Sequence, residues 1–327
     1  QTPPPAAPAD QADSAQQGEL VFKPDFFADQ RPNTALDMVS RVPGFSVQDG
    51  DGSRGFEGAV GNILINGSRP ASKNDTGSSV LSRTLVAQVE RIELIRGGAP
   101  GIDMQGYSVV VNVITRTEAS TEQILTGNMA FFEGGTDRGF GTYQFTRRNG
   151  DRVWGFTLSD GVAIDDSNGV GRVIRRDANG VVLRDEGYYS DQTGGGQAVR
   201  VNFADAFMGG KIDLTARFGL NDYSQYSLQD GPTILRDNRF AEEGSSGEVG
   251  AVFTRPMANG LTSETRFIRE FNDFENASTS LTTTNGVAGP EQRFASEGNA
   301  SETILRSLVR WERSPALTLE AGGEIAY

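Results

Sequence analysis

The stretch that decides the fold runs from Lys211 to Tyr223 and reads Lys-Ile-Asp-Leu-Thr-Ala-Arg-Phe-Gly-Leu-Asn-Asp-Tyr. Apolar residues occupy the even positions from 212 to 220, and polar residues or glycine occupy the odd positions from 213 to 221. Successive side chains of a β-strand point to opposite faces, so this period of two predicts a strand with one apolar and one polar face. We expect Ile212, Leu214 and Phe218 on the apolar face and Arg217 on the polar face.

The same alternation recurs along the rest of the second part of the chain. Near the end, Leu317 and Leu319 alternate with polar or small residues, and we expect Glu320 and Glu324 on the polar face. Together with the first stretch, these segments predict nine strands after Thr117, the others lying at 123–133, 139–147, 154–158, 197–207, 248–256, 261–271 and 302–311.

The predicted connections between these strands alternate in length. Those at 149–151, 208–210, 256–260 and 314–315 are tight, whereas those at 165–193, 222–245 and 272–297 are long and polar. Short turns at one end and long loops at the other are typical of an outer-membrane β-barrel, and Trp154 and Trp311 beside short turns fit its aromatic girdle. A soluble antiparallel sandwich has equally alternating strands, but it has no reason to gather its long loops at one end.

Composition narrows the functional classes. The chain has 327 residues, a formal net charge of -13, and neither cysteine nor histidine. The absence of those two residues removes disulfides, the usual transition-metal ligands and the usual nucleophile and base pairs, so we expect no enzyme, catalytic residue, cofactor or metal site. The acidic balance argues against nucleic acid as a partner. No apolar run reaches the length of a membrane-spanning helix.

The first part of the chain has a different texture. Residues 1–18 are rich in proline, alanine and glutamine, and we expect them to form a disordered mature N-terminal arm. Residues 19–117 predict one compact mixed α/β domain, with a short helix capped by Asn33 or Thr34 and stopped by Pro43-Gly44, and four short strands. Residues 118–327 then form the strand region.

Five landmarks in the first part carry a family resemblance. They are 33–47 with its Pro43-Gly44, Arg54-Gly55-Phe56, 63–67 ending in Asn66-Gly67, 89–97 ending in Arg96-Gly97, and 111–115. In order and spacing they resemble the plug domain of TonB-dependent outer-membrane receptors. The resemblance covers 19–117 closely and the remainder by pattern alone. Between Gly97 and Val109 the sequence departs from the family pattern, which leaves the local packing there open.

The resemblance implies a fold class and a location. We expect a mixed α/β plug domain followed by antiparallel transmembrane β-barrel strands, a partial barrel with about nine of the twenty-two strands of such receptors, in the bacterial cell outer membrane. The implied partners are TonB with its inner-membrane energising complex, outer-membrane lipid and lipopolysaccharide, and a small-molecule or oligosaccharide ligand. The implied function is import of a scarce nutrient, either a metal chelate such as a siderophore or a carbohydrate, with energy delivered by TonB.

Two sets of site residues follow from the resemblance. Glu19, Leu20, Val21 and Phe22 are the best candidate for the TonB box, which recruits TonB by adding a strand; the same residues could simply be the first strand of the plug. Arg54 and Arg96 match plug arginines that pair with barrel glutamates and latch the plug in place, and we expect the two to lie close together or to share acidic partners. A plain surface ion pair is the alternative, and we expect the matching glutamates to lie beyond these residues.

Two further readings stay open. The chain could be a non-transporting outer-membrane receptor or an assembly and interaction protein, which an uptake assay with and without TonB would separate from an importer. Nine is an odd number of strands, and a small barrel has no room for a plug of this size. We therefore expect the rest of the barrel to come from missing sequence or from another chain.

Overall fold

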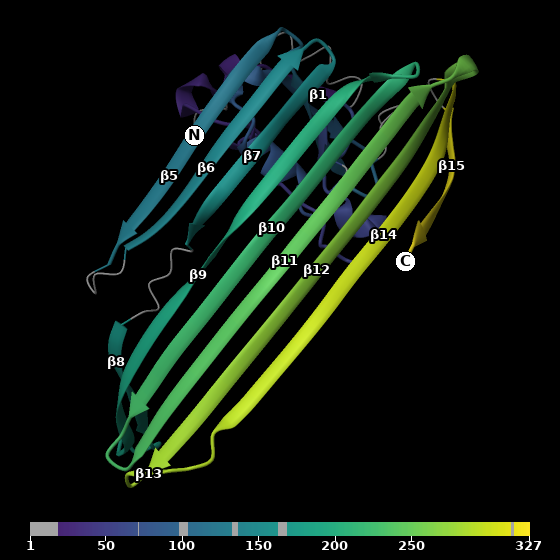
Figure 1. Cartoon of the computed structure of the whole chain (residues 1–327). Coiled ribbons are helices and arrows are strands. Elements are labelled where there is room, and N and C mark those ends of the chain that lie inside the picture. The colour runs from purple at the N-terminus through teal and green to yellow at the C-terminus, as the bar shows by residue number, and fades with distance from the viewer. Residues whose placement is uncertain (1–18, 71, 98–103, 133–136, 163–168, 315–316) are drawn as a thin grey trace.

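A computed structural model describes residues 19–70, 72–97, 104–132, 137–162, 169–314 and 317–327. Two sheets organise them: a four-stranded sheet near the N-terminus and a much larger antiparallel sheet. In Figure 1 the N-terminal elements lie behind the upper end of the large sheet. The N-terminal arm predicted for residues 1–18 lies outside the described residues. None of the described helices is long and apolar enough to cross a membrane.

The plug, by which we mean residues 19–115, has the sheet order β1-β3-β4-β2. Its strands are β1 (Glu19–Phe22), β2 (Ile63–Ile65), β3 (Val89–Arg96) and β4 (Val109–Thr115). β4 pairs antiparallel with β3 and parallel with β2, and β1 is an edge strand held by β3 alone. The helices are α2 (Ala35–Val39) and α3 (Gly77–Ser82), with 3-10 turns at Pro24–Gln30, Phe56–Ala59 and Val86–Gln88.

Sequence chemistry explains where α2 begins. Thr34 is the N-cap: its side chain accepts a hydrogen bond from the Asp37 backbone N–H at 3.2 Å, and Asp37 accepts from the backbone N–H groups of Asn33 and Thr34 at 2.9 Å. This reciprocal capping satisfies donors that the first helical turn leaves unpaired. Met38 and Val39 then face inward and are fully buried. The helix is shorter than the predicted segment, because regular helical structure ends at Val39.

The plug core forms between these helices and the small sheet. It contains fully buried apolar side chains from both, including Phe27, Met38, Leu81, Ile92 and Val113. The three predicted landmarks Pro43-Gly44, Asn66-Gly67 and Arg96-Gly97 all lie in this one unit. Asn66 and Gly67 have φ values of 50° and 81°, and the Asn66 side chain bonds to Thr115, so this turn joins the end of β2 to the end of β4.

The large sheet has nine strands along its main path, in the order β15-β14-β12-β11-β10-β9-β7-β6-β5, which confirms the nine predicted strands. Their bounds are β5 (Ser120–Phe131), β6 (Asp137–Asn149), β7 (Arg152–Val162), β9 (Val182–Phe207), β10 (Gly210–Asp230), β11 (Ile234–Pro256), β12 (Leu261–Thr284), β14 (Gln292–Ser314) and β15 (Leu317–Ala326). Two short strands, β8 (Gly169–Arg176) and β13 (Val287–Ala288), pair with β9 and β12. In the described part of the chain β5 and β15 do not pair, so the sheet is an unclosed, partial barrel (Figure 1).

The predicted long polar loops are wrong. Most of 222–245 and 272–297 belongs to β10, β11, β12 and β14, which continue as paired strands to Asp230, Ile234, Thr284 and Gln292. The apolar and polar alternation fades there because neither face needs to be apolar, while backbone pairing continues regardless of side-chain type. Much of 165–193 is likewise strand, in β8 and β9.

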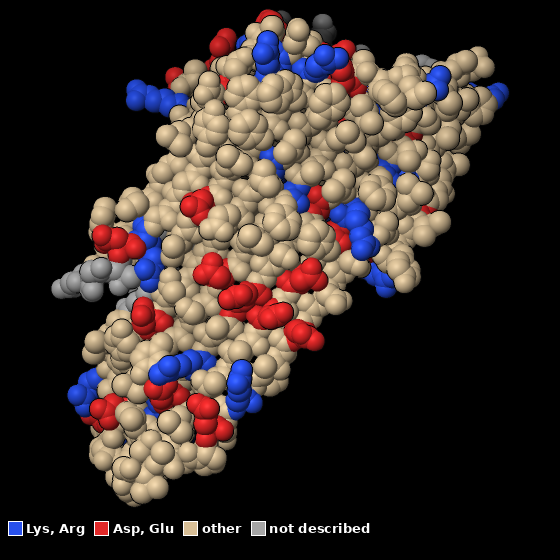
Figure 2. Space-filling view, viewed as in Figure 1, with Lys and Arg blue, Asp and Glu red and all other residues tan. Residues whose placement is uncertain are grey.

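The alternation does place side chains on the expected faces. Leu214, Phe218, Leu317 and Leu319 lie on the face away from the plug and are 37–48% exposed. Arg217 lies on the opposite face, and Glu324 accepts a hydrogen bond from the plug. We call the outward apolar side chains near the plug level the apolar belt, and Figure 2 shows this face as mostly uncharged there: Val199, Val201, Phe218, Leu220, Val249, Phe267, Leu305 and Val309.

Candidate functional site

A row of charged side chains crosses the inner face of the large sheet where it meets the plug. Pairing aligns Arg200 of β9 with Arg217 of β10, Arg217 with Glu248 of β11, Glu248 with Glu270 of β12, and Glu270 with Glu302 of β14. Residues directly opposite one another on adjacent strands share a face. The five residues therefore form one inner charge row, with two cations followed by three carboxylates.

Glu248 of β11 accepts hydrogen bonds from the plug segment 72–74. One carboxylate oxygen accepts from the Ser72 hydroxyl, and the other accepts from the backbone N–H groups of Lys73 and Asn74 at 3.0 and 3.1 Å and from the Asn74 side chain at 2.9 Å. Glu248 is only 4% exposed. These bonds satisfy a carboxylate that would otherwise be costly to bury.

Lys73 supplies the positive charge for the other two carboxylates. Its Nζ forms an ion pair with Glu302, lies 3.6 Å from Glu270, and donates to the Ser53 carbonyl at 2.9 Å. The Lys73 side chain is 4% exposed. A compact ammonium with three donors is suited to a site with several separate acceptors.

Asp75 faces the cationic end of the same row. Its carboxylate lies 3.4 Å from Arg200 Nε, and it accepts a bidentate pair of hydrogen bonds from Arg83 of the plug at 2.9 and 2.8 Å. The Lys73 ammonium thus pairs with Glu270 and Glu302, while the Asp75 carboxylate pairs with an arginine. The charge order of segment 72–75 is complementary to that of the inner charge row.

A second contact lies closer to the tight turns. Phe56 of the plug is 3% exposed, and the guanidinium groups of Arg266 and Arg306 lie 5.0 and 4.8 Å from its ring centroid. Its backbone N–H donates to Glu324 at 2.9 Å. Gly55 precedes it with φ at 86°, a backbone conformation that favours glycine. A Cβ there would lie 2.9 Å from an oxygen of the Glu324 side chain, which would have to shift.

The two predicted latch arginines have different surroundings. Arg54 Nε lies 3.8 Å from Glu302, although 75% of the Arg54 side chain is exposed. Arg96 is exposed at the end of β3 and makes no ion pair within the described ranges. The expected pairing of both arginines with a shared partner is therefore not found there. Glu302 belongs to β14, so the carboxylate nearest to Arg54 lies within this sequence. The expectation that the family's matching glutamates lie beyond this sequence stays a prediction.

The candidate TonB box Glu19–Phe22 coincides with β1. Its four residues pair with Ile92–Ile95 of β3, and Phe22 is 5% exposed. Burial and the nearby Glu93 carboxylate raise the pKa of Glu19 above its ordinary value, and Arg91 opposes this shift. The segment is thus a plug strand, and it is held at one edge only.

A cavity of about 730 Å³ opens beside the inner charge row on the side away from the tight turns. Gly52, Arg54 and Asn74 of the plug line it, together with Arg217, Glu270 and Glu302 of the sheet. Its walls offer both cationic and anionic groups to a polar ligand. The residues that the structure describes include no group of three or more acidic side chains arranged to hold a metal ion.

Sequence reasoning missed Lys73 and its neighbours. The chain has only three lysines, at positions 23, 73 and 211, and Lys73 sits between serine and asparagine in a polar loop. Nothing in that loop distinguishes a solvated lysine from a buried one. The alternation of β11, β12 and β14 does place Glu248, Glu270 and Glu302 on polar faces, but only strand register aligns them.

Comparison with known proteins identifies the plug. Residues 11–106 match the model of the TonB-dependent Receptor Plug Domain. No curated protein matches the sequence.

Several solved structures are similar to the chain. The ferric yersiniabactin uptake receptor FyuA from Yersinia pestis is 11% identical, with 89% of this chain and 61% of that one covered and a TM-score of 0.25. The siderophore receptor PiuA from Acinetobacter baumannii is 10% identical, with 95% of this chain and 61% of that one covered and a TM-score of 0.26. The ferric-catecholate import receptor Fiu from E. coli K12 is 11% identical, with 95% of this chain and 59% of that one covered and a TM-score of 0.32. The chain spans about three fifths of the length of these structures.

Proposed function

We propose that this chain, a TonB-dependent outer-membrane receptor by its plug domain and partial barrel sheet, imports a scarce nutrient with energy delivered by TonB. Receptors with this plug are transporters rather than enzymes. The nutrient is a metal chelate such as a siderophore, or a carbohydrate. The observation that carries the proposal is the complementary contact between segment 72–75 and the inner charge row.

That contact suits a plug that must move. Among the described residues, an apolar cluster around Phe56, Val60, Ile268 and Ile304 joins the plug to the sheet, and the contacts of segment 72–75 are polar. Water can solvate polar groups when they separate. Separating an apolar core instead costs roughly 25 cal/mol of free energy for each Å² of apolar surface exposed. Force on the plug can therefore displace segment 72–75 without exposing a large apolar area.

The edge strand β1 is the proposed point of attachment for TonB. Four residue pairs with β3 hold it, so it can detach without disturbing β3 and β4. A detached extended segment can add to a sheet of a partner through main-chain hydrogen bonds. We propose Arg54, through Glu302, as a latch residue, and Arg96 as a second latch candidate without a partner in the described residues.

Uptake measurements test this function. A strain lacking the receptor gene is complemented with the gene or with its Val21→Pro variant, and uptake of labelled ferric siderophores and oligosaccharides is followed with and without TonB. We expect uptake only with TonB and the unaltered gene, with ligand binding retained in Val21→Pro. Uptake that is indifferent to TonB would overturn the proposal.

A second candidate function is surface recognition without transport. Strands β9 to β14 contain 21 to 26 residues, apart from the two-residue β13, and at about 3.3 Å per residue they extend roughly 70–85 Å, well past a membrane. Such a projection offers surface for a partner. Ligand binding without uptake in the same assay would favour this function and an assembly or interaction role.

A further inference from the structure

Strand β8 has one free edge. It pairs with residues 182–190 of β9 and with no other strand among the described residues. Pairing of β7 with β9 ends at Gly195, and β8 takes the place of β7 on that edge while β10 occupies the other edge. Figure 1 shows β8 beside β9 at the end of the sheet furthest from the plug. The second edge of β8 therefore presents main-chain N–H and C=O groups that no described strand satisfies.

β8 is cationic although the chain as a whole is acidic. Its eight residues include Arg172, Arg175 and Arg176 and no acidic residue, whereas the whole chain has a formal net charge of -13. Arg172 forms an ion pair with Asp185 of β9 at 2.7 Å. Arg175 and Arg176 are exposed and have no ion-pair partner among the described residues. An extended segment beside β8 would therefore meet uncompensated positive charge.

Exposed apolar side chains flank these charges. Val170 and Ile174 of β8 are 89% and 48% exposed, and Leu183 of β9 is 62% exposed. The register partners of Val170 and Ile174 on β9 belong to the outward face, and the alternation of β9 places Leu183 on that face too. Charged edge strands resist unwanted pairing, but a strand protected in that way has no need of exposed apolar side chains. Alternating apolar and cationic positions suit an edge that recognises another strand.

The level of β8 along the sheet places it outside the hydrocarbon layer. Ser190, opposite the first residue of β8, is 11 residues beyond Val201 of the apolar belt. At roughly 3.3 Å per residue and a barrel tilt of about 40°, Ser190 lies about 28 Å further along the membrane normal than Val201. Half the thickness of the hydrocarbon core is only about 15 Å. β8 is thus surrounded by water on the side away from the tight turns, where a protein outside the cell can reach it.

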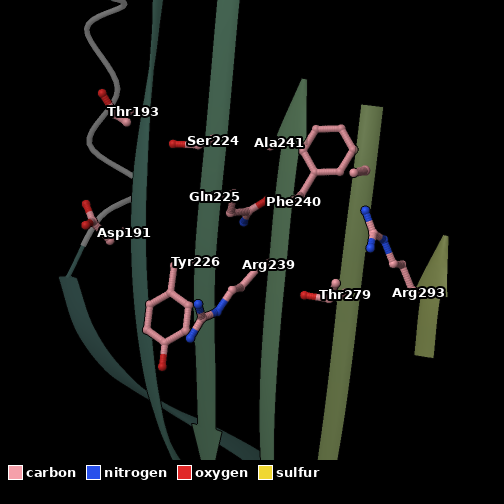
Figure 3. Close-up of a pocket in the computed structure, with 11 residues that line it drawn as sticks. Asp191, Thr193, Ser224, Gln225, Tyr226, Arg239, Phe240, Ala241, Thr279 and Arg293 are labelled. Atoms are coloured by element: carbon pink, nitrogen blue, oxygen red, sulfur yellow. The ribbon is translucent and has the colours of Figure 1, made fainter. Parts of the chain in front are cut away.

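A groove on the outward face marks the limit of this surface. It lies on β9 to β14 and has a volume of about 380 Å³. Figure 3 shows Asp191 and Tyr226 in its lining, and the two are directly opposite in the strand register. Arg239 of the groove already pairs with Asp237 at 3.3 Å. An acidic segment would meet carboxylates in the groove, so the surface suited to it is β8 and not the groove.

A second copy of this chain does not fit the edge. Two β8 edges side by side would bring the three arginines of one copy close to the three of the other. Like charges on paired strands are destabilising, whereas opposite charges stabilise the pairing. The charge of β8 therefore selects an acidic occupant.

We propose that the free edge of β8 binds an extended, acidic segment of a partner protein outside the cell by adding it to the sheet as a further strand. Main-chain hydrogen bonds along β8 hold the segment. Its aspartate or glutamate side chains pair with Arg175 and Arg176, and its apolar side chains pack on Val170 and Ile174. The inference deepens the second candidate function, surface recognition, and rests on the proposed membrane position.

Peptide binding to the purified chain in detergent micelles tests the edge. The probe is a fluorescent peptide of about ten residues, composed of valine, threonine and glutamate, and its anisotropy reports binding. One control peptide has lysine in place of glutamate, and a second has alternate backbone nitrogens methylated. We expect the probe to bind about ten-fold or more tightly than either control, because the first lacks the ion pairs and the second cannot form the main-chain hydrogen bonds. Hydrogen exchange at the β8 amides should slow only with the probe.

Variants of the chain assign the binding to β8. Arg175→Gln with Arg176→Gln should weaken binding of the probe about five-fold. Arg239→Gln removes an outward arginine that is 68% exposed on β11, and as the matched control it should bind the probe within about two-fold of the unaltered chain. Arg175→Glu with Arg176→Glu should bind the lysine peptide more tightly than the probe, a gain that misfolding cannot produce.

Three outcomes would overturn the proposal. The first is equal binding of the probe and either control peptide, and the second is unchanged binding of the probe by Arg175→Gln with Arg176→Gln. The third is self-association of the chain that protects the β8 amides without any peptide, because a second copy then occupies the edge. Nutrient uptake and TonB do not enter these measurements, so this inference and the proposed import fail separately.

Discussion

Lys73 of the plug forms an ion pair with Glu302 of β14 across 229 residues of sequence. The same ammonium lies 3.6 Å from Glu270, and its side chain is almost fully buried. One lysine therefore offsets two sheet carboxylates at the plug boundary. The complementary pair of Asp75 and Arg200 lies at the other end of the inner charge row.

Replacing Lys73 with methionine should loosen the plug. Removing one partner of a buried ion pair leaves the other charge uncompensated and costs about 3–5 kcal/mol. We expect faster proteolysis of the plug in the folded protein, measured by limited digestion and mass spectrometry. Lys23→Met, at an exposed lysine, is the control and should digest at the original rate. Adding Glu270→Gln and Glu302→Gln to Lys73→Met should restore part of the resistance; no effect of Lys73→Met would contradict the assigned role.

Two substitutions of Phe56 distinguish apolar packing from the attraction between its ring and the neighbouring arginines. Phe56→Leu keeps most of the apolar contact but removes the ring between Arg266 and Arg306, and we expect a loss of roughly 1–2 kcal/mol. Phe56→Ala also creates a cavity and should cost about 3–5 kcal/mol. Thermal denaturation followed by near-ultraviolet circular dichroism measures both. If Phe56→Leu matches the unaltered protein, the arginines contribute packing only.

The capping box of α2 predicts both a stability loss and a pH effect. Thr34→Ala should destabilise the plug by about 0.5–2 kcal/mol. Backbone hydrogen bonds from Thr34 and Asn33 lower the pKa of Asp37 below its ordinary value of 3.8. A lowered carboxyl pKa stabilises the fold above the unfolded value, and this stability is lost as pH falls through the folded value. Below pH 4, the free energy of unfolding from denaturation curves should therefore depend less on pH in Asp37→Asn than in the unaltered protein. An identical pH dependence in the two proteins would argue against the cap.

Docking of β1 should weaken as pH rises. The pKa of Glu19 in the plug is raised above 4.5, so the docked strand binds a proton more tightly than a detached strand does. The stabilisation is complete below pH 4.5 and disappears as pH rises through the folded pKa. Hydrogen exchange at Leu20 and Val21, corrected for intrinsic rates, should show this trend. Glu19→Gln should remove the trend and slow exchange at neutral pH, and an unchanged trend in that variant would exclude Glu19 as its source.

The sequence by itself determined the strand region and the plug. Period-two alternation located all nine main strands and assigned Leu214, Phe218 and Arg217 to their faces, because side-chain direction in a strand depends only on position along the chain. Local turn and cap chemistry predicted a mixed α/β domain in the first part of the chain, because caps and turns depend on neighbouring residues. The resemblance of the landmarks from Asn33 to Thr115 to a known family identified that domain as a plug. The strand extensions beyond Asp222 and Asn272 escaped detection because backbone pairing there does not require an apolar face.

Only the tertiary structure decided which charges meet. Glu248, Glu270 and Glu302 are separated by 22 and 32 residues in the sequence, and strand register alone places them side by side. Lys73 became a buried cation because the plug lies against that row, and a polar loop gives no local sign of burial. Arg96 matches the same family pattern as Arg54, yet it lies where no described carboxylate reaches it. An ion pair depends on distances of a few ångströms in space, and these are set by how two sheets are placed and not by residue type.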